Sequence, residues 1–315
     1  MTSRHLVDPD LLAFLDQFPD SELSREALPQ MRAQMAALLP PAEIDAAVEV
    51  KTVPGPAGAP DIDLRILRPK DATGVLPVIY HIHGGGYVAG AADQSDPMNG
   101  AQSTELDCAV VSVDYRLAPE TPFPGAIEDC YAGLAWTFAN ATEQRFDPAR
   151  IGVMGESAGG GLAAALALLA RDRGEYRLAF QHLIYPMLDD RTGSGSEPHP
   201  YAGEFVWTEA KNRFGWEALL GHPPGSGAPS PYAVPARAPD LSGLPPTFLY
   251  TGALDLFLEE DMDYARRLAR AGVPTEFHLF PGSFHGFELQ ADAYVAQQAR
   301  QTSRAALRRF LAPRS

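Results

Sequence analysis

A serine between glycines, in Gly155-Glu-Ser-Ala-Gly159, is the first group in the sequence whose residue types point to chemistry. Residues 151–154 before it have the composition of a buried strand, and residues 158–171 after it that of an apolar helix. A sharp strand-to-helix turn needs small residues on both sides, because the serine backbone there is strained and closely packed. The turn also places Ser157 at a helix N-terminus, where developing negative charge is favoured. This context predicts a nucleophile rather than a glycine-rich turn that only joins two elements.

A second glycine run, His83-Gly-Gly-Gly-Tyr87, follows a strand-like segment at residues 77–82. An acyl-transfer enzyme must hold the oxyanion of its tetrahedral intermediate with preorganised N–H donors. Consecutive glycines allow such close approach because they carry no Cβ. A flexible loop and a phosphate cradle are the alternatives. The chain contains neither G-x-G-x-x-G nor G-x-x-x-x-G-K-[ST], which argues against a nucleotide.

Together these two runs resemble the HGGG and G-x-S-x-G motifs of the hormone-sensitive-lipase-like esterases, a family of the α/β-hydrolases. Three further segments resemble the family: Tyr115-Arg-Leu-Ala-Pro-Glu120, Tyr185-Pro-Met-Leu-Asp189 and Gly282-Ser-Phe-His-Gly286. The resemblance runs from about Pro77 to the C-terminus, with the motifs in the family's order. It implies a carboxylic-ester hydrolase that needs no metal or organic cofactor.

The resemblance assigns roles position by position. The matching triad has a nucleophile, an acid and a base at Ser157, Asp255 and His285. The matching oxyanion-hole N–H groups are those of Gly85, Gly86 and Ala158. His83 matches a residue that braces the loop without transferring a proton. The chain departs from the family at Glu156, where Asp is frequent, and after Asp255, where Leu-Phe-Leu-Glu259 replaces a common Pro-Leu-Arg-Asp, so contacts around the acid are expected to differ.

The residues themselves also support this triad. A serine hydroxyl is a weak nucleophile at neutral pH and needs a base, which a carboxylate must orient. Asp255 and His285 follow the strand-like segments 247–250 and 275–280, at the sheet edge where α/β sites form. Among rival acids, Glu259 begins a helix, where it favours the helix dipole, and Asp189 is expected to anchor a loop.

The remaining candidate site residues are histidines and aromatic residues. His81 and His83 lie two residues apart, but no cluster of carboxylates or cysteines completes a metal site, so packing or bracing is expected for them. Four aromatic residues are expected to line a substrate pocket: Tyr87, Trp207, Phe214 and Phe284. For the aromatics of residues 205–220, packing between two parts of the molecule is the equal alternative.

The elements that must position these residues alternate between strand and helix. Alternation of this kind predicts crossover units, hence an α/β-hydrolase fold with a mostly parallel eight-stranded sheet and helices on both faces. The expected strands are residues 48–53, 62–68, 77–82, 109–114, 151–154, 179–185, 247–250 and 275–280. The first two alternate apolar and polar residues, which is typical of antiparallel strands. The expected helices are residues 98–106, 126–140, 158–171, 259–271 and 289–311.

Residues 190–244 interrupt this alternation, with a glycine- and serine-rich patch and an aromatic helix-like stretch. An insertion after a sheet strand usually covers the active site. We therefore expect a helical cap formed by residues 1–45 and 190–244, and a catalytic domain formed by residues 46–189 and 245–315.

Composition and charge exclude some classes of binding partner. The chain has 315 residues, 45% of them hydrophobic and 21% charged, as in an ordinary globular protein, and a net charge of −15. Such a surface repels nucleic acid and anionic membranes. Cys108 and Cys130 are expected to be buried free thiols. The start of the chain lacks a signal-peptide pattern and no apolar stretch reaches membrane-spanning length, so we expect a cytoplasmic protein. The expected partner, implied by the family resemblance, is a small-molecule ester.

The expected reaction is hydrolysis of short- to medium-chain acyl esters through an acyl-enzyme. Cleavage of amides or lactones uses the same intermediate, so the sequence does not separate these reactions. A non-catalytic receptor is the alternative from another class, since the plant gibberellin receptors resemble this family but have lost the triad histidine. Here His285 is present, which favours an enzyme. Residues 275–280 are expected to form an edge strand, with which a second copy of the chain could pair to give a homodimer.

Overall fold

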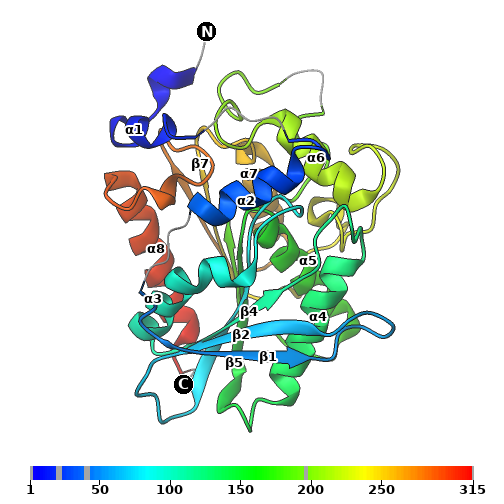
Figure 1. Ribbon diagram of the computed structural model, residues 1–315, viewed down its shortest axis with the longest axis vertical. Helices are drawn as coiled ribbons and strands as arrows, with labels where there is room; N and C mark the ends of the chain where they lie inside the picture. The colour runs from blue at the N-terminus through cyan, green and yellow to red at the C-terminus, as the bar shows by residue number, and fades with distance from the viewer. Residues whose placement is uncertain (1–2, 19–22, 39–42, 195–197, 314–315) are drawn as a thin grey trace.

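All strands of the computed structural model, which describes residues 3–18, 23–38, 43–194 and 198–313, join in one sheet (Figure 1). Their order is β1-β2-β4-β3-β5-β6-β7-β8, and β2 pairs antiparallel with both neighbours while β3 to β8 are parallel. The bounds are β1 Ala47–Val53, β2 Ile62–Arg68, β3 Leu76–Ile82, β4 Ala109–Asp114, β5 Phe146–Glu156, β6 Gln181–Ile184, β7 Thr247–Gly252 and β8 Thr275–Phe280. The mostly parallel eight-stranded sheet expected from the sequence is thereby confirmed, with β8 at one edge.

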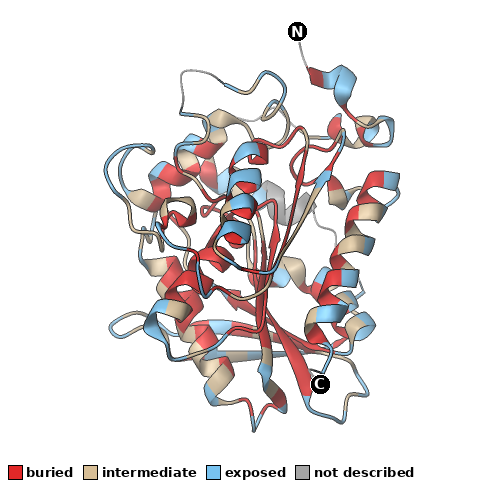
Figure 2. Cartoon of the chain, turned by 180° about the vertical axis from the view of Figure 1, so that it is seen from behind, coloured by how far each residue is buried: buried red, intermediate tan, exposed pale blue. Residues whose placement is uncertain are grey.

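Helices cover both faces of this sheet because successive side chains of each buried strand point to opposite sides. On one face, Ile79 and Met154 share an apolar cluster with Leu307 of α8 (Tyr294–Leu311), and α3 (Asp96–Leu106) lies beside it. On the other face pack α4 (Gly125–Ala139), α5 (Ala158–Arg173) and α7 (Leu258–Arg270). Figure 2 shows the buried sheet between helices whose outer sides are exposed.

The segments expected to form a cap lie at one end of the sheet (Figure 1). Their elements are η1 Ser3–Leu6, η2 Pro9–Leu11, α1 Leu12–Leu15, α2 Leu28–Leu38, α6 Glu209–Leu220 and η4 Pro235–Arg237. The N–H of Asp8 donates to the carbonyl of Gly282 at 3.0 Å, in the loop after β8. Gly215 of α6 lies so close to the oxyanion loop that a Cβ there would come within 2.8 Å of the Gly86 carbonyl. Both parts of the expected cap therefore touch the loops that follow the parallel strands.

Two expected helices begin later than the apolar pattern suggested. The aromatic stretch becomes helical only at Glu209, because Val206 has a φ of +61° and Thr208 is extended as the N-cap. The C-terminal helix begins at Tyr294, after the short helix η5 (Phe287–Leu289) and a turn. In both cases the first residues of the expected helix form bends, turns or a short 3-10 helix instead.

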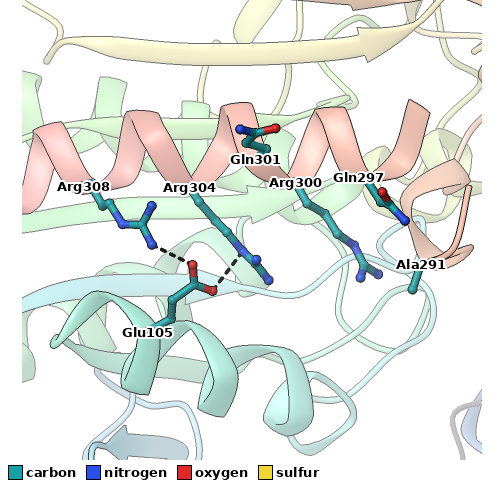
Figure 3. Close-up of a pocket in the computed structure, with 7 residues that line it drawn as sticks. All are labelled: Glu105, Ala291, Gln297, Arg300, Gln301, Arg304 and Arg308. Carbon is teal, nitrogen blue, oxygen red and sulfur yellow. Dashed lines mark hydrogen bonds and ion pairs between the residues drawn. The ribbon is translucent and has the colours of Figure 1, made fainter. Parts of the chain in front are cut away.

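A cleft of about 250 Å³ lies between α3 and α8 (Figure 3). Its lining residues are Glu105, Ala291, Gln297, Arg300, Gln301, Arg304 and Arg308. Glu105 of α3 forms ion pairs with Arg304 at 3.1 Å and with Arg308 at 2.8 Å. These contacts join the two helices that cover one face of the sheet.

Two simpler expectations can be compared with the structure directly. Cys108 and Cys130 are buried and free, as predicted, and burial raises the pKa of the Cys108 thiol to about 12. Within the described ranges, none of the helices has both the length and the apolar character that a membrane span requires.

Candidate active site

Ser157, His285 and Asp255 form one hydrogen-bonded chain. The Nε2 of His285 lies 2.9 Å from the Oγ of Ser157, and its Nδ1 lies 2.8 Å from the Oδ2 of Asp255. Ser157 and His285 are each 7% exposed, whereas Asp255 is 1% exposed. The three residues come from loops after β5, β8 and β7, so the fold brings together side chains that are far apart in the sequence.

The turn that carries Ser157 is strained, as a nucleophile between strand and helix requires. Ser157 has a φ of +57° and a ψ of −122°, directly between the end of β5 and the start of α5. Its glycine neighbours have no room for a side chain. A Cβ on Gly155 would come within 2.3 Å of the Gly159 carbonyl, and one on Gly159 within 2.1 Å of the Ile82 carbonyl. The same packing holds the turn against the end of β3.

The loops that carry Asp255 and His285 are tied to each other. The N–H of Leu254 donates to the carbonyl of Ser283 at 2.9 Å, which ties the Asp255 loop to the His285 loop. The second carboxylate oxygen of Asp255 accepts the N–H of Phe257 at 3.0 Å. Both oxygens of this buried carboxylate are therefore occupied, which fixes its orientation toward His285.

Three aromatic rings pack around the His285 imidazole. Tyr185 lies 4.6 Å from it between ring centroids, Phe257 lies 5.2 Å away edge-on, and Trp207 lies 6.2 Å away. The Tyr185 hydroxyl also donates to Glu288, whose pKa is raised by burial. Tyr185 immediately follows β6 at the carboxyl edge of the sheet and begins the Tyr185-Pro-Met-Leu-Asp189 segment that resembles the family.

The expected oxyanion loop, residues 83–87, has an unusual backbone that explains its glycines. Gly85 and Gly86 have φ values of +122° and +62°, and a Cβ on Gly85 would come within 2.1 Å of the Ala89 carbonyl. In the described part of the chain, the N–H groups of Gly85, Gly86 and Ala158 donate no hydrogen bond. Three donors are thus available to a ligand at the loop and at the start of α5. His83 packs on Tyr115 at 4.3 Å between ring centroids.

The four aromatic residues expected to line the pocket are placed differently from one another. Trp207 is half-buried, close to His285, and its ring tip leaves no space for a Cβ on Gly86. Tyr87 is buried and donates to the Met187 carbonyl at 3.0 Å. Phe284 is fully buried in the apolar cluster that contains Tyr185, and Phe214 packs against a separate cluster that contains Leu28 and Val88.

The rival acids lie outside the triad. Glu259 is exposed in the first turn of α7, and Asp189 pairs with Arg191 at 2.6 Å. Asp190 is buried and pairs with Arg237, which joins the start of the inserted segment to its return. The residues that the structure describes contain no group of three His, Cys, Asp or Glu side chains that could hold a metal ion.

A buried acid near the triad lowers the stability of the fold at neutral pH. Asp261 of α7 is fully buried, and burial, with the nearby charges of Glu260 and Asp255, raises its pKa well above the ordinary value. The folded protein therefore binds this proton more tightly than the unfolded chain does. The contribution of Asp261 to the free energy of unfolding is fully present below the pKa of about 3.9 that the group has in the unfolded chain. It is lost as the pH rises through the higher pKa of the folded state.

Asp261→Asn is therefore expected to stabilise the protein, because the isosteric amide carries no charge to bury. The gain in the free energy of unfolding should increase with pH by up to about 1.4 kcal/mol per unit until the folded pKa is passed. Urea unfolding of both proteins at several pH values measures it. Asp263→Asn, at an exposed position of the same helix, is the matched control. If the difference in free energy of unfolding between variant and wild type did not change with pH, ionisation of Asp261 would not destabilise the folded protein and the prediction would be wrong.

Comparison with known proteins identifies relatives over almost the whole chain. A family profile described as the alpha/beta hydrolase fold matches residues 79–289. The chain is 37% identical over 314 residues to the carboxylesterase NlhH of Mycobacterium tuberculosis, covering 97% of this chain and 96% of that protein. It is 33% identical over 227 residues to an arylesterase of Saccharolobus solfataricus, covering 72% and 73% of the two chains.

Solved structures agree with these matches. A bacterial heroin esterase superposes with a TM-score of 0.94 and 40% identity, over 99% of this chain and all of its own. The esterase LipW from Mycobacterium marinum superposes with a TM-score of 0.83 and 35% identity, over 98% of each chain.

Proposed function

The chain belongs to the α/β-hydrolase family, and within it to the hormone-sensitive-lipase-like esterases, and for its carboxylesterase activity we propose a serine mechanism centred on Ser157. In this mechanism His285 is the base and Asp255 the acid that orients it. The backbone N–H groups of Gly85, Gly86 and Ala158 form the oxyanion hole.

The observation that carries the proposal is that both nitrogens of the His285 ring are engaged. A neutral imidazole has one N–H and one acceptor nitrogen. A carboxylate only accepts, so Asp255 fixes the proton on Nδ1 at 2.8 Å. Nε2 then accepts the Ser157 hydroxyl proton at 2.9 Å, which is the tautomer that a general base needs.

The reaction proceeds in two halves. His285 takes the Ser157 proton as Oγ attacks the ester carbonyl, and the oxyanion is bound by the three N–H groups at the loop and the start of α5. The alcohol leaves with the proton held by His285, and Ser157 carries the acyl group. Water, activated by the same histidine, then releases the acid and regenerates the serine. Asp255 stabilises the imidazolium throughout.

Residues 1–45 and 190–244 act together as a cap over this site, and the remaining residues form the catalytic domain. The N–H of Ser3 in the first part donates a hydrogen bond to the carboxylate of Glu204 in the second. They also bind the loops of the catalytic domain, since the N–H of Gly203 donates to the Leu254 carbonyl at 3.0 Å. Residues 1–2, 19–22, 39–42 and 195–197 of this proposed cap lie outside the described residues.

Short- to medium-chain acyl esters are the proposed substrates. The half-buried indole of Trp207 abuts Gly86 of the oxyanion loop and lies 6.2 Å from the His285 ring between centroids, so a bulky side chain stands close to the reacting groups. The net charge of −15 also opposes binding to anionic lipid surfaces. A small-molecule ester therefore fits the site better than an aggregated lipid.

A series of p-nitrophenyl esters tests this proposal. We expect kcat/KM to rise from acetyl to a short or medium chain, since each buried methylene adds about 0.8 kcal/mol of binding. It should fall steeply beyond about ten carbons, when the chain no longer fits beneath the cap. Acetyl, butyryl, hexanoyl, decanoyl and palmitoyl esters are compared below their aggregation limits. A maximum at palmitoyl, or activation at an oil–water interface, would identify a true lipase instead.

A further inference from the structure

A line of buried polar side chains begins beneath the oxyanion loop and is used by none of the steps above. The Nε2 of His81, in β3, lies 3.0 Å from the Oε2 of Glu156, in the turn that carries the nucleophile. The other ring nitrogen, Nδ1, lies 2.9 Å from the Ser112 hydroxyl and 3.1 Å from the side-chain nitrogen of Asn99. His81, Ser112 and Asn99 are fully buried.

These contacts fix where the protons lie. The Asn99 amide nitrogen only donates, so the Nδ1 of His81 accepts from it and carries no proton. The proton of the neutral ring is then on Nε2 and is donated to Glu156. The Nε2–H donor of His81 thus holds the Glu156 carboxylate in one orientation.

The same carboxylate binds the oxyanion loop. Its other oxygen, Oε1, accepts the N–H of Gly84 at 3.0 Å. Gly84 packs directly on the turn of the nucleophile, because a Cβ there would come within 3.0 Å of the Glu156 carbonyl and 3.4 Å of the Ser157 Cβ. Glu156 adjoins Ser157, and Gly84 adjoins Gly85. One carboxylate therefore sets the distance between the nucleophile and the N–H groups that face the oxyanion.

A packing role for His81 does not account for this arrangement. An apolar residue would fill the same buried position in β3 without burying two ring nitrogens that need partners. A metal site does not account for it either, since no third ligand completes one among the described residues. The ring is used as a donor of fixed direction, and its target is the group that bridges the two halves of the site.

We propose that His81 is a positioning residue for ester hydrolysis, which fixes the Glu156 carboxylate and through it the oxyanion loop on the nucleophile. The inference rests on the proposed serine mechanism. It goes further because His81 contacts neither substrate nor triad and still affects how well the transition state is bound.

Two substitutions separate donation from packing. His81→Leu removes the donor and keeps an apolar side chain in the space, whereas the amide of His81→Gln can still donate to Glu156. We expect kcat to fall by about 10- to 30-fold in the leucine variant, less than the loss of a whole oxyanion donor, with KM changed less than about threefold. The glutamine variant should recover most of kcat.

A trifluoromethyl ketone with a short alkyl chain gives a second readout. Ser157 Oγ adds to its carbonyl carbon, the carbonyl oxygen becomes an oxyanion, and the serine proton passes to His285, so its inhibition constant reports on the oxyanion hole. We expect this constant to rise in His81→Leu by the same factor as kcat falls. A loss of kcat with an unchanged inhibition constant would overturn the proposal.

His182→Leu is the matched control. His182 is equally buried in a parallel strand, β6, and its Nε2 lies 2.8 Å from the Ser303 hydroxyl, with no link to the site. This variant should lose stability while kcat and the inhibition constant of the folded enzyme stay at the wild-type values. If it loses kcat as much as His81→Leu, the effect is one of general packing and the proposal is wrong.

A third substitution covers the case in which His81→Leu does not fold. His81→Asn keeps a polar group toward Ser112 and Asn99 but is too short to reach Glu156. It should therefore show the low kcat of a lost donor, while His81→Gln does not. Equal kcat values for these two amides would overturn the proposal. Failure of the wild type to hydrolyse any ester would instead remove the proposed function, and wild-type activity with no effect of His81 substitution would remove this inference alone.

Discussion

Ser157→Ala is expected to lower ester turnover by about 10⁵- to 10⁶-fold, because removal of the nucleophile leaves only the binding and oxyanion contributions. The serine side chain is small and 7% exposed, so its loss should leave the fold intact. Hydrolysis of p-nitrophenyl butyrate measures kcat, and thermal unfolding checks the fold.

The control for this variant is Ser242→Ala, at an exposed serine far from the triad in sequence and in a loop. It should keep the wild-type kcat and KM. Turnover above one tenth of the wild-type value in Ser157→Ala would mean that another residue is the nucleophile.

Asp255→Asn is expected to reduce kcat by about 10⁴-fold with little change in the fold. The amide is nearly the same size as the carboxylate, but its nitrogen donates toward the Nδ1 of His285 in place of accepting from it. The proton of the ring is then driven to Nε2, the atom that must take the Ser157 proton. Steady-state kinetics on the same ester measure the loss.

Glu259→Gln provides the comparison for this change, since Glu259 is the acid at which the chain departs from the family's pattern after Asp255. It is exposed at the first turn of α7, so we expect less than a twofold change in kcat there. Equal damage from the two amides would show that the carboxylate serving His285 is not Asp255.

The strands were predictable because buried strands such as β4 leave continuous apolar runs, while the antiparallel β2 and the edge strand β8 mix apolar with polar residues between turn-forming segments. Ile62–Arg68, Ala109–Asp114 and Thr275–Phe280 agree with the expected bounds residue by residue. β5 begins at Phe146, five residues before the apolar run, because Leu76 pairs with Phe146 beyond an irregular register. Such pairing depends on a neighbouring strand and leaves no local mark in the sequence.

The candidate triad was predictable because each residue follows a strand and carries a recognisable loop. The rings around His285 were not, since Tyr185 and Phe257 reach it only through the packing of separate loops. For His81 the sequence predicts only packing or bracing. Its link to Glu156 follows from the register of β3 and β5, in which His81 pairs with Met154, and from side-chain directions that one sequence does not reveal.

The pocket aromatics show the same limit. Tyr87 follows the oxyanion loop and was expected beside the substrate, but its hydroxyl fits against Gly161 of α5, where a Cβ would come within 2.6 Å of it. Only the absence of a side chain on a distant helix makes that position available. Aromatic residues near a motif therefore predict proximity to the site, not the direction in which each ring points.

Labelling with a fluorophosphonate tests the central claim most directly, because the reagent forms a bond between phosphorus and an activated serine oxygen as fluoride leaves. We predict one adduct per chain, located by peptide mass spectrometry on Ser157, formed in step with the loss of esterase activity and slowed by an ester substrate. Ser157→Ala should form none. Complete labelling at another residue, or full activity after Ser157 is labelled, would contradict the account.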